Sequence, residues 1–193
     1  MKGGRSRLQK HGHVWKVAVC FSVTWLLWTP GALSQQDTVR EYQFKAAFLF
    51  NLIKFVRWPD SSFVDGAAPF CLGIVGKDPF HEDLADAVAG RSVQDRRLEV
   101  RRFAGTADVS ELEQCHLLFI SLAAQSRANE LVKSLEGASV LTVAEWETFT
   151  ESGGMLELFV VDNKLAFEVN ASAAKTAGLE ISSQLLKLAR VIQ

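Results

Sequence analysis

The sequence lacks every short motif that marks a common catalytic site. It contains no G-x-S-x-G elbow, no P-loop, no H-E-x-x-H pair, and no G-x-G-x-x-G after the first predicted strand. Residues 73–77 place two glycines before a lysine, but without the spacing of a phosphate loop. We therefore expect no catalytic residues and no cofactor, and we expect a protein that is not an enzyme.

Cysteine and histidine, the usual zinc ligands, are also few. The segment 81–86 (HEDLAD) is acidic, but acidic side chains in a first helical turn complement the helix dipole without any metal. His116 directly follows Cys115 in a predicted strand, so their side chains point to opposite faces and cannot form a Cys-His dyad. We expect no metal site.

Acidic residues are absent from the first 34 positions, which carry five basic residues. An apolar run at residues 17–28 and a small-residue segment at 30–34 follow, and together they predict a signal peptide cleaved after Ser34. An uncleaved anchor is the alternative, but about 12 apolar residues reach only about 18 Å across a hydrocarbon core of about 30 Å. We expect a periplasmic chain that begins at Gln35.

The exported part, residues 35–193, contains 16 basic and 22 acidic residues. A net negative charge disfavours nucleic acid as a partner. No second apolar run approaches the length of a membrane span.

Cysteine is scarce, with Cys20, Cys71 and Cys115 as the three examples. Cys20 lies in the predicted signal peptide without a lipobox before it, so cleavage leaves an even pair. Because exported compartments oxidise thiols, Cys71 and Cys115 are candidates for a disulfide, which would stabilise the fold by about 4 kcal/mol on the chain-entropy model. Each stands at the start of a predicted buried strand, so a bond would make those strands neighbours.

The strongest pattern is a long amphipathic helix over residues 40–59, ended by Trp58-Pro59 because proline disfavours helical geometry before it. Its apolar sector is about twice as wide as one sheet covers, and Lys45 is its main interruption. We expect a second covering surface, either in a dimer or from another helix of the same chain, with the C-terminal helix as the first candidate. The side chains placed on the buried side are Phe44, Phe48, Leu49, Leu52, Phe55 and Val56.

Buried strands alternate with helices in the rest of the chain. Strands are predicted at residues 69–76, 97–103, 115–121 and 138–143, and helices at 78–90, 110–114, 125–136, 145–150, 171–179 and 182–192. Residues 155–161 and 165–169 indicate a β-hairpin. The order predicts one α/β domain over residues 35–193, with a mainly parallel sheet covered on both faces and an added antiparallel hairpin.

Arg57 and Trp58 form the best candidate contact for a ligand or partner. The tryptophan ring offers a stacking surface, and the guanidinium beside it offers a planar group that donates paired hydrogen bonds. The structural alternative is a tryptophan that packs under the following loop.

Seven segments, in this order, resemble the YfiR family of bacterial periplasmic proteins: EYQFKAAFLFNLIKFVRWP, PFCLGIVGKDPF, CHLLFIS, SVLTV, GGMLELF, LAFEVN and SSQLLKLARV. The match covers nearly all of residues 35–193. The resemblance implies a three-layer α/β/α sandwich, a homodimer, and repression of a membrane-bound diguanylate cyclase through its periplasmic part, which controls cyclic-di-GMP signalling and biofilm formation.

The resemblance also implies an outer-membrane lipoprotein that sequesters the repressor. Cys71 and Cys115 match a structural disulfide of the family. The second disulfide that some members carry near the Gly-Gly-Met segment cannot form here, because no cysteine occurs there.

Two other functions stay open on the sequence. A periplasmic small-ligand-binding module that serves another receptor or transporter would use Arg57 and Trp58 as pocket residues. An enzyme without a recognisable motif has no supporting set of residues.

Overall fold

The computed structural model describes residues 32–162 and 164–192. The predicted signal peptide, residues 1–34, therefore lies outside the described residues apart from its last three positions. Within the described ranges, no helix combines the length and the apolar character that a membrane span requires.

Short helices and strands follow one long helix. The helices are α1 (Ala32–Leu52), α2 (Asp83–Val88), α3 (Val109–Leu112), α4 (Ala128–Ser134), α5 (Ala171–Thr176) and α6 (Ser183–Leu186), with 3₁₀ turns at Ile53–Phe55, Asp60–Ser62 and Leu122–Arg127. The strands are β1 (Val56–Arg57), β2 (Phe70–Val75), β3 (Ser92–Val93), β4 (Arg96–Phe103), β5 (Leu117–Ile120), β6 (Leu141–Ala144), β7 (Leu156–Val161), β8 (Lys164–Asn170), β9 (Glu180–Ile181) and β10 (Arg190–Ile192).

Eight of these strands form one sheet in the order β10-β8-β7-β6-β5-β2-β4-β3. Strands β4, β2, β5, β6 and β7 are parallel, and β8 returns antiparallel to β7 as a hairpin. Parallel neighbours need crossover connections, which contain α2, α3 and α4 between β2 and β6, whereas turns connect β6 to β7. The predicted mainly parallel sheet with an antiparallel hairpin is confirmed.

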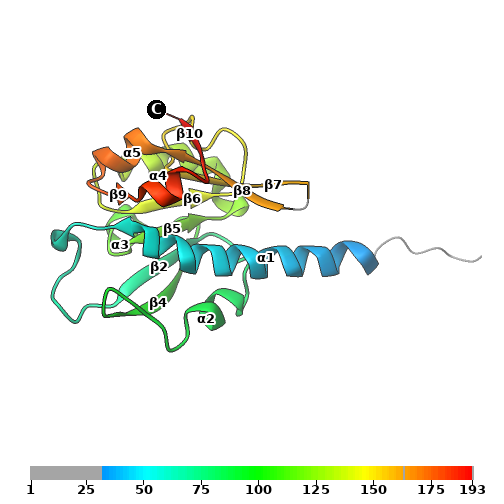
Figure 1. Cartoon of the computed structure of the whole chain (residues 1–193), viewed down its shortest axis with the longest axis horizontal. Helices are drawn as coiled ribbons and strands as arrows, with labels where there is room; N and C mark the ends of the chain where they lie inside the picture. Colours follow the sequence, from blue (N-terminus) through cyan, green and yellow to red (C-terminus); the bar gives the residue numbers. More distant parts are fainter. Residues whose placement is uncertain (1–31, 163, 193) are drawn as a thin grey trace, which may run out of the picture.

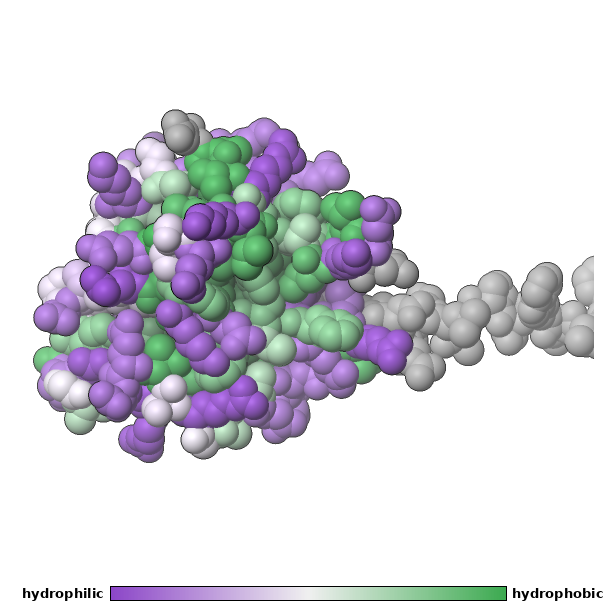
Figure 2. Space-filling view, in the orientation of Figure 1, coloured by the Kyte–Doolittle hydropathy of each residue, from purple (hydrophilic) through white to green (hydrophobic). Residues whose placement is uncertain are grey.

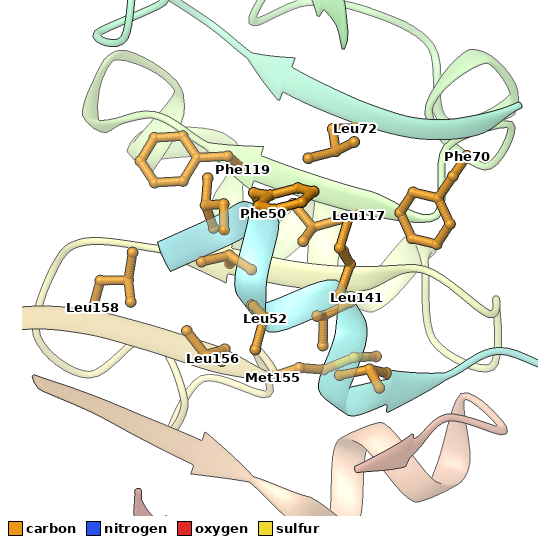
Figure 3. Packing of buried hydrophobic residues seen from close by; sticks show 14 of the residues in the cluster. Phe50, Leu52, Phe70, Leu72, Leu117, Phe119, Leu141, Met155, Leu156 and Leu158 are labelled. Atoms are coloured by element: carbon orange, nitrogen blue, oxygen red, sulfur yellow. The ribbon is translucent and has the colours of Figure 1, made fainter. Parts of the chain in front are cut away.

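Helices cover both faces of this sheet (Figure 1). Helices α1, α2, α5 and α6 share one hydrophobic cluster with the strands, and α3 and α4 share a second cluster. Figure 3 shows Leu72, Leu117 and Leu156 of three strands directed at α1, where Phe50 and Leu52 meet them. The three-layer arrangement implied by the resemblance is confirmed.

Cys71 and Cys115 form a disulfide with an S–S distance of 2.12 Å and a Cα–Cα distance of 4.6 Å. Strands β2 and β5 are neighbours, as the sequence predicts for such a bond. Position 73 of β2 faces this contact and favours glycine, since a Cβ there would lie 2.5 Å from the Leu118 side chain and 3.2 Å from the Cys115 sulfur.

The long helix ends earlier than predicted. Helix α1 stops at Leu52, a 3₁₀ turn follows, and Val56–Arg57 form β1. This short strand pairs antiparallel with Glu180–Ile181, and the partner lies far along the chain. This pairing overrides the helical propensity of the residues before Trp58. The local sequence pattern contains no sign of it.

The C-terminal region is also less helical than predicted. Residues 182–192 contain only the short helix α6, and Arg190–Ile192 pair with β8 as the parallel strand β10. Residues 145–150 form turns, not a helix. Helix α2 begins at Asp83 and not at residue 78 as predicted, because Asp78 accepts the Phe80 N–H in a turn that precedes the helix.

Candidate functional site

The most apolar cavity among those described lies between α1 and the β7–β8 hairpin, and we call it the α1–hairpin groove. Its volume is about 830 Å³. It is lined by Arg40, Glu41, Phe44, Ala47, Phe48, Asn51, Val160, Lys164 and Leu165. Its lining combines phenylalanine, valine and leucine with charged side chains, and protein interfaces combine an apolar core with a polar rim.

Large apolar side chains are left in solvent at this groove. Phe44 is 64% exposed, Val160 is 47% exposed, and Val161 beside it is 50% exposed. Figure 2 shows apolar residues gathered at the hairpin, next to the helix that projects from the body of the molecule in Figure 1. Contiguous exposed apolar surface with a polar rim marks interaction sites in soluble proteins.

A buried charge cluster holds the helix wall of the groove in place. Lys45 is 4% exposed, and its Nζ donates to Glu145 Oε2 at 2.5 Å and to Glu41 Oε1 at 2.5 Å. The Tyr42 hydroxyl donates to the other oxygen of Glu145 at 2.9 Å. Burial, and then the charge of Glu145, raise the pKa of Tyr42, so the phenol stays a donor.

The segment 145–154, which begins with that carboxylate, also holds the hairpin wall. The Phe149 N–H donates to Glu157 at 3.0 Å, and the Thr150 hydroxyl donates to Glu168 at 2.5 Å. Glu157 and Glu168 stand opposite each other on β7 and β8 and are almost fully buried. Burial raises the pKa of Glu157. Both walls of the groove are therefore fastened to one segment.

The structure does not bring Arg57 and Trp58 together as a recognition surface. Trp58 is 3% exposed, its indole N–H donates to the His116 carbonyl at 3.0 Å, and its ring meets Phe70 edge-on. Arg57 points into solvent and pairs with Glu180 at 3.1 Å. Neither residue lines the groove. The structural alternative was a tryptophan packed under the following loop, and Trp58 instead belongs to the hydrophobic core.

The sequence contains one signal for the groove that the prediction missed. Val160 and Val161 are consecutive apolar residues near the tip of a hairpin. Successive side chains of a strand point to opposite faces, so a strand with one face in solvent would have a polar residue at one of the two positions. Phe44 gave no comparable signal, because apolar residues surround most of the helix.

His116 fastens the loop after β1 to the strand that carries the disulfide. Its Nδ1 accepts the Cys71 N–H at 3.0 Å, and its Nε2 donates to the Ser62 carbonyl at 3.2 Å. The ring packs against both Phe63 and Phe70, with centroids 4.3 and 4.7 Å away. Burial lowers the pKa of His116 to about 4, although the bond to Ser62 opposes that change.

Acid should weaken the fold through this histidine. Above pH 6.5, the imidazole is neutral in both the folded and unfolded chains. Between pH 6.5 and about 4 the unfolded chain binds a proton that the folded chain excludes, so the free energy of unfolding falls by up to about 3 kcal/mol across this window. Urea titrations at several pH values measure the slope.

His116→Gln keeps a donor and an acceptor but removes this titration, so its slope between pH 6.5 and 4 should be shallower than that of the natural protein. His81→Asn, at an exposed histidine, controls for the loss of a histidine as such. Equal slopes in the natural protein and in His116→Gln would contradict the assignment.

Comparison with known proteins agrees with this architecture. The sequence matches the domain family DUF4154, described as YfiR/HmsC-like, over residues 42–190. A crystal structure of a conserved domain protein from Vibrio cholerae O1 biovar El Tor is similar, with a TM-score of 0.57 and 12% sequence identity. The match covers 77% of this chain and 60% of that chain, and at this identity it supports a shared fold alone. The chain belongs to the YfiR/HmsC-like family.

Proposed function

We propose that this protein is a periplasmic regulator that binds the periplasmic part of an inner-membrane diguanylate cyclase and represses it. The YfiR/HmsC-like family is regulatory, periplasmic and linked to cyclic-di-GMP signalling. The observation that supports binding is the α1–hairpin groove, with Phe44 and Val160 exposed beside charged side chains. In this proposal the groove is the surface that docks on the cyclase.

The proposal includes two further partners implied by the family resemblance. One is a second copy of the chain, in a homodimer. The other is an outer-membrane lipoprotein that sequesters the regulator and so releases the cyclase.

Charge placed in the groove should weaken the complex. Phe44→Asp puts a carboxylate at a site that is already 64% exposed, so the fold tolerates it, but docking would then bury an unpaired charge. Loss of one central contact costs about 2 kcal/mol or more, which is roughly a thirtyfold rise in Kd. Calorimetric titration of the candidate cyclase's periplasmic domain measures this change.

Leu188→Asp is the matched control, because Leu188 is a 77% exposed leucine that does not line the groove. It should bind as the natural protein does. Equal weakening by both variants would show that charge, and not the groove, decides the affinity.

The function itself is tested in cells. Deletion of the gene should raise cyclic-di-GMP and biofilm formation, and a chain without residues 1–34 should fail to complement the deletion. Complementation by Leu188→Asp but not by Phe44→Asp would assign the repression to the groove. Unchanged cyclic-di-GMP in the deleted strain, together with no binding in vitro, would sink the regulatory proposal.

A small-ligand-binding module is the second candidate, and one cavity favours it. A cleft of about 770 Å³ lies between α4 and α5, with Lys133, Asn129, Ser172 and Thr176 among its polar lining residues. Arg57 and Trp58 do not line it. Thermal-shift screening of small anions against the natural protein and Lys133→Ala would identify such a ligand.

A further inference from the structure

The outer side of strand β4 is only partly paired. On its inner side, β4 pairs with β2 from Leu98 to Phe103. On its outer side, it meets β3 at Arg96 and Arg97 alone. Among the residues that the structure describes, no strand continues this pairing beyond β3, so the second half of β4 is a free sheet edge.

The direction of the backbone groups shows which ones are free. The Phe103 carbonyl accepts the Gly76 N–H at 2.9 Å, so Phe103 faces β2. Because peptide groups alternate along a strand, Glu99 and Arg101 also face β2, whereas Val100 and Arg102 direct their N–H and C=O groups outward.

The side chains at this edge are mainly basic. Arg97, Arg101 and Arg102 are all exposed, and Glu99 is the one acidic residue of the strand. Arg101 pairs with Glu99 at 3.3 Å and Arg102 pairs with Asp78 at 2.7 Å. Residues 35–193 as a whole carry more acidic than basic residues, so this edge stands out by its positive charge.

A second copy of β4 does not fit the edge. Antiparallel pairing centred on Val100 would bring Phe103 of the other copy opposite Arg97, where Ser92 already lies. Centring on Arg101 or Arg102 avoids Ser92 but places two arginines directly opposite each other, which is destabilising.

We propose that the free edge of β4 is a second docking surface, which takes up an extended acidic segment of a partner protein as an added strand. Backbone groups of Val100 and Arg102 supply the hydrogen bonds, as in other cases of strand addition. Acidic side chains of the partner lie opposite Arg101 and Arg102, where opposite charges stabilise a cross-strand pair. This edge lies at the far side of the sheet from the β7–β8 hairpin, so the proposal does not depend on the groove.

Amide hydrogen exchange tests this surface directly. The probe is a blocked valine hexapeptide that carries two adjacent glutamates, which can lie opposite Arg101 and Arg102 on the two faces of the added strand. The control probe replaces both glutamates with lysine. The glutamate peptide should slow exchange at Val100 and Arg102, while Glu99, Arg101 and Phe103 should not change, because their N–H groups already bond to β2. The lysine peptide should bind about tenfold more weakly or not at all.

Val100→Pro removes one outward N–H and leaves the ladder to β2 intact, since proline is tolerated at a free sheet edge. It should abolish peptide binding, whereas Val100→Thr, which keeps the N–H and the branched shape, should bind as before. An unfolding midpoint for Val100→Pro close to that of the natural protein shows that the ladder survived.

Three outcomes overturn the proposal. Equal binding of the two peptides would show that the charge of the added strand does not contribute to binding. Protection of Val100 and Arg102 that grows with protein concentration and without peptide would assign the edge to a second copy. If neither peptide slows exchange at Val100 and Arg102, the arginines serve only to prevent unwanted strand pairing, as charges do on many edge strands.

Discussion

Lys45→Met should lower the free energy of unfolding by about 3 kcal/mol, because it leaves the Glu145 carboxylate buried without its cation. Lys45 is 5% exposed and Glu145 is 9% exposed at their side chains. Two charges of this kind are costly to desolvate, and removal of one partner leaves that cost uncompensated. Urea denaturation followed by circular dichroism measures the change.

The double variant Lys45→Met with Glu145→Gln distinguishes the charge from the shape. It removes both charges and keeps an acceptor for the Tyr42 hydroxyl, so it should be more stable than Lys45→Met alone. Lys54→Met is the control on the same stretch of chain, at an exposed lysine, and should stay within about 0.5 kcal/mol of the natural protein. A loss below about 1 kcal/mol for Lys45→Met would mean that water reaches the cluster.

Phe50→Ala should cost about 3 to 5 kcal/mol, whereas Phe44→Ala should change stability by no more than about 0.5 kcal/mol. Phe50 is 6% exposed in the core beside the sheet, and Phe44 is 64% exposed. Removal of the buried ring leaves a cavity lined by the strands' leucines. Removal of the exposed ring leaves water in its place. The same denaturation experiment compares the two variants.

Phe48→Ala should fall between these values, since Phe48 is half-buried against Phe167, with ring centroids 5.0 Å apart. Similar losses for Phe44→Ala and Phe50→Ala would show that the rotation of α1 about its axis differs from the one described.

The rotation of α1 is also where the sequence prediction was only partly right, since Leu49 and Leu52 are buried as predicted but other positions differ. Apolar residues occupy most sides of this helix, so periodicity alone does not decide which ones face the sheet. The prediction placed Phe44 on the buried side and treated Lys45 as an interruption, but Lys45 is buried and Phe44 is exposed. The decisive partner, Glu145, lies 100 positions away, beyond any local pattern.

The prediction named a dimer or another helix of the same chain, preferably the C-terminal one, as the second cover of α1. Helix α2 of the same chain packs on α1, and Tyr42 lies edge-on to Phe80, just before α2, at 5.6 Å. Leu185 of α6 belongs to the same hydrophobic cluster. The homodimer stays a prediction. The C-terminal residues that were predicted as helix pair with β8, because Val191 and Ile192 suit a strand once β8 offers an edge.

The buried strands were predictable because each is a short apolar run bounded by glycine, proline or polar residues. Strand β2 (FCLGIV) is buried along its whole length, and so is β5 (LLFI). The hairpin was predictable from two β-rich runs with a short polar connection. The groove between that hairpin and α1 was not, since it depends on the relative placement of two elements that are distant in sequence.

The strand order has one more consequence for function. Strands β4, β2, β5, β6 and β7 follow the order 2-1-3-4-5, and open α/β sheets of this order bind ligands in the crevice where the first and third strands end. Here Gly76 follows β2 and Ser121 follows β5, and a Cβ at position 76 would lie 2.6 Å from the Ser121 hydroxyl and 3.1 Å from Ala124. The two connections therefore lie in close contact at the place where such folds admit a nucleotide or flavin. This close approach agrees with the proposal that partners bind along the flanks of the sheet.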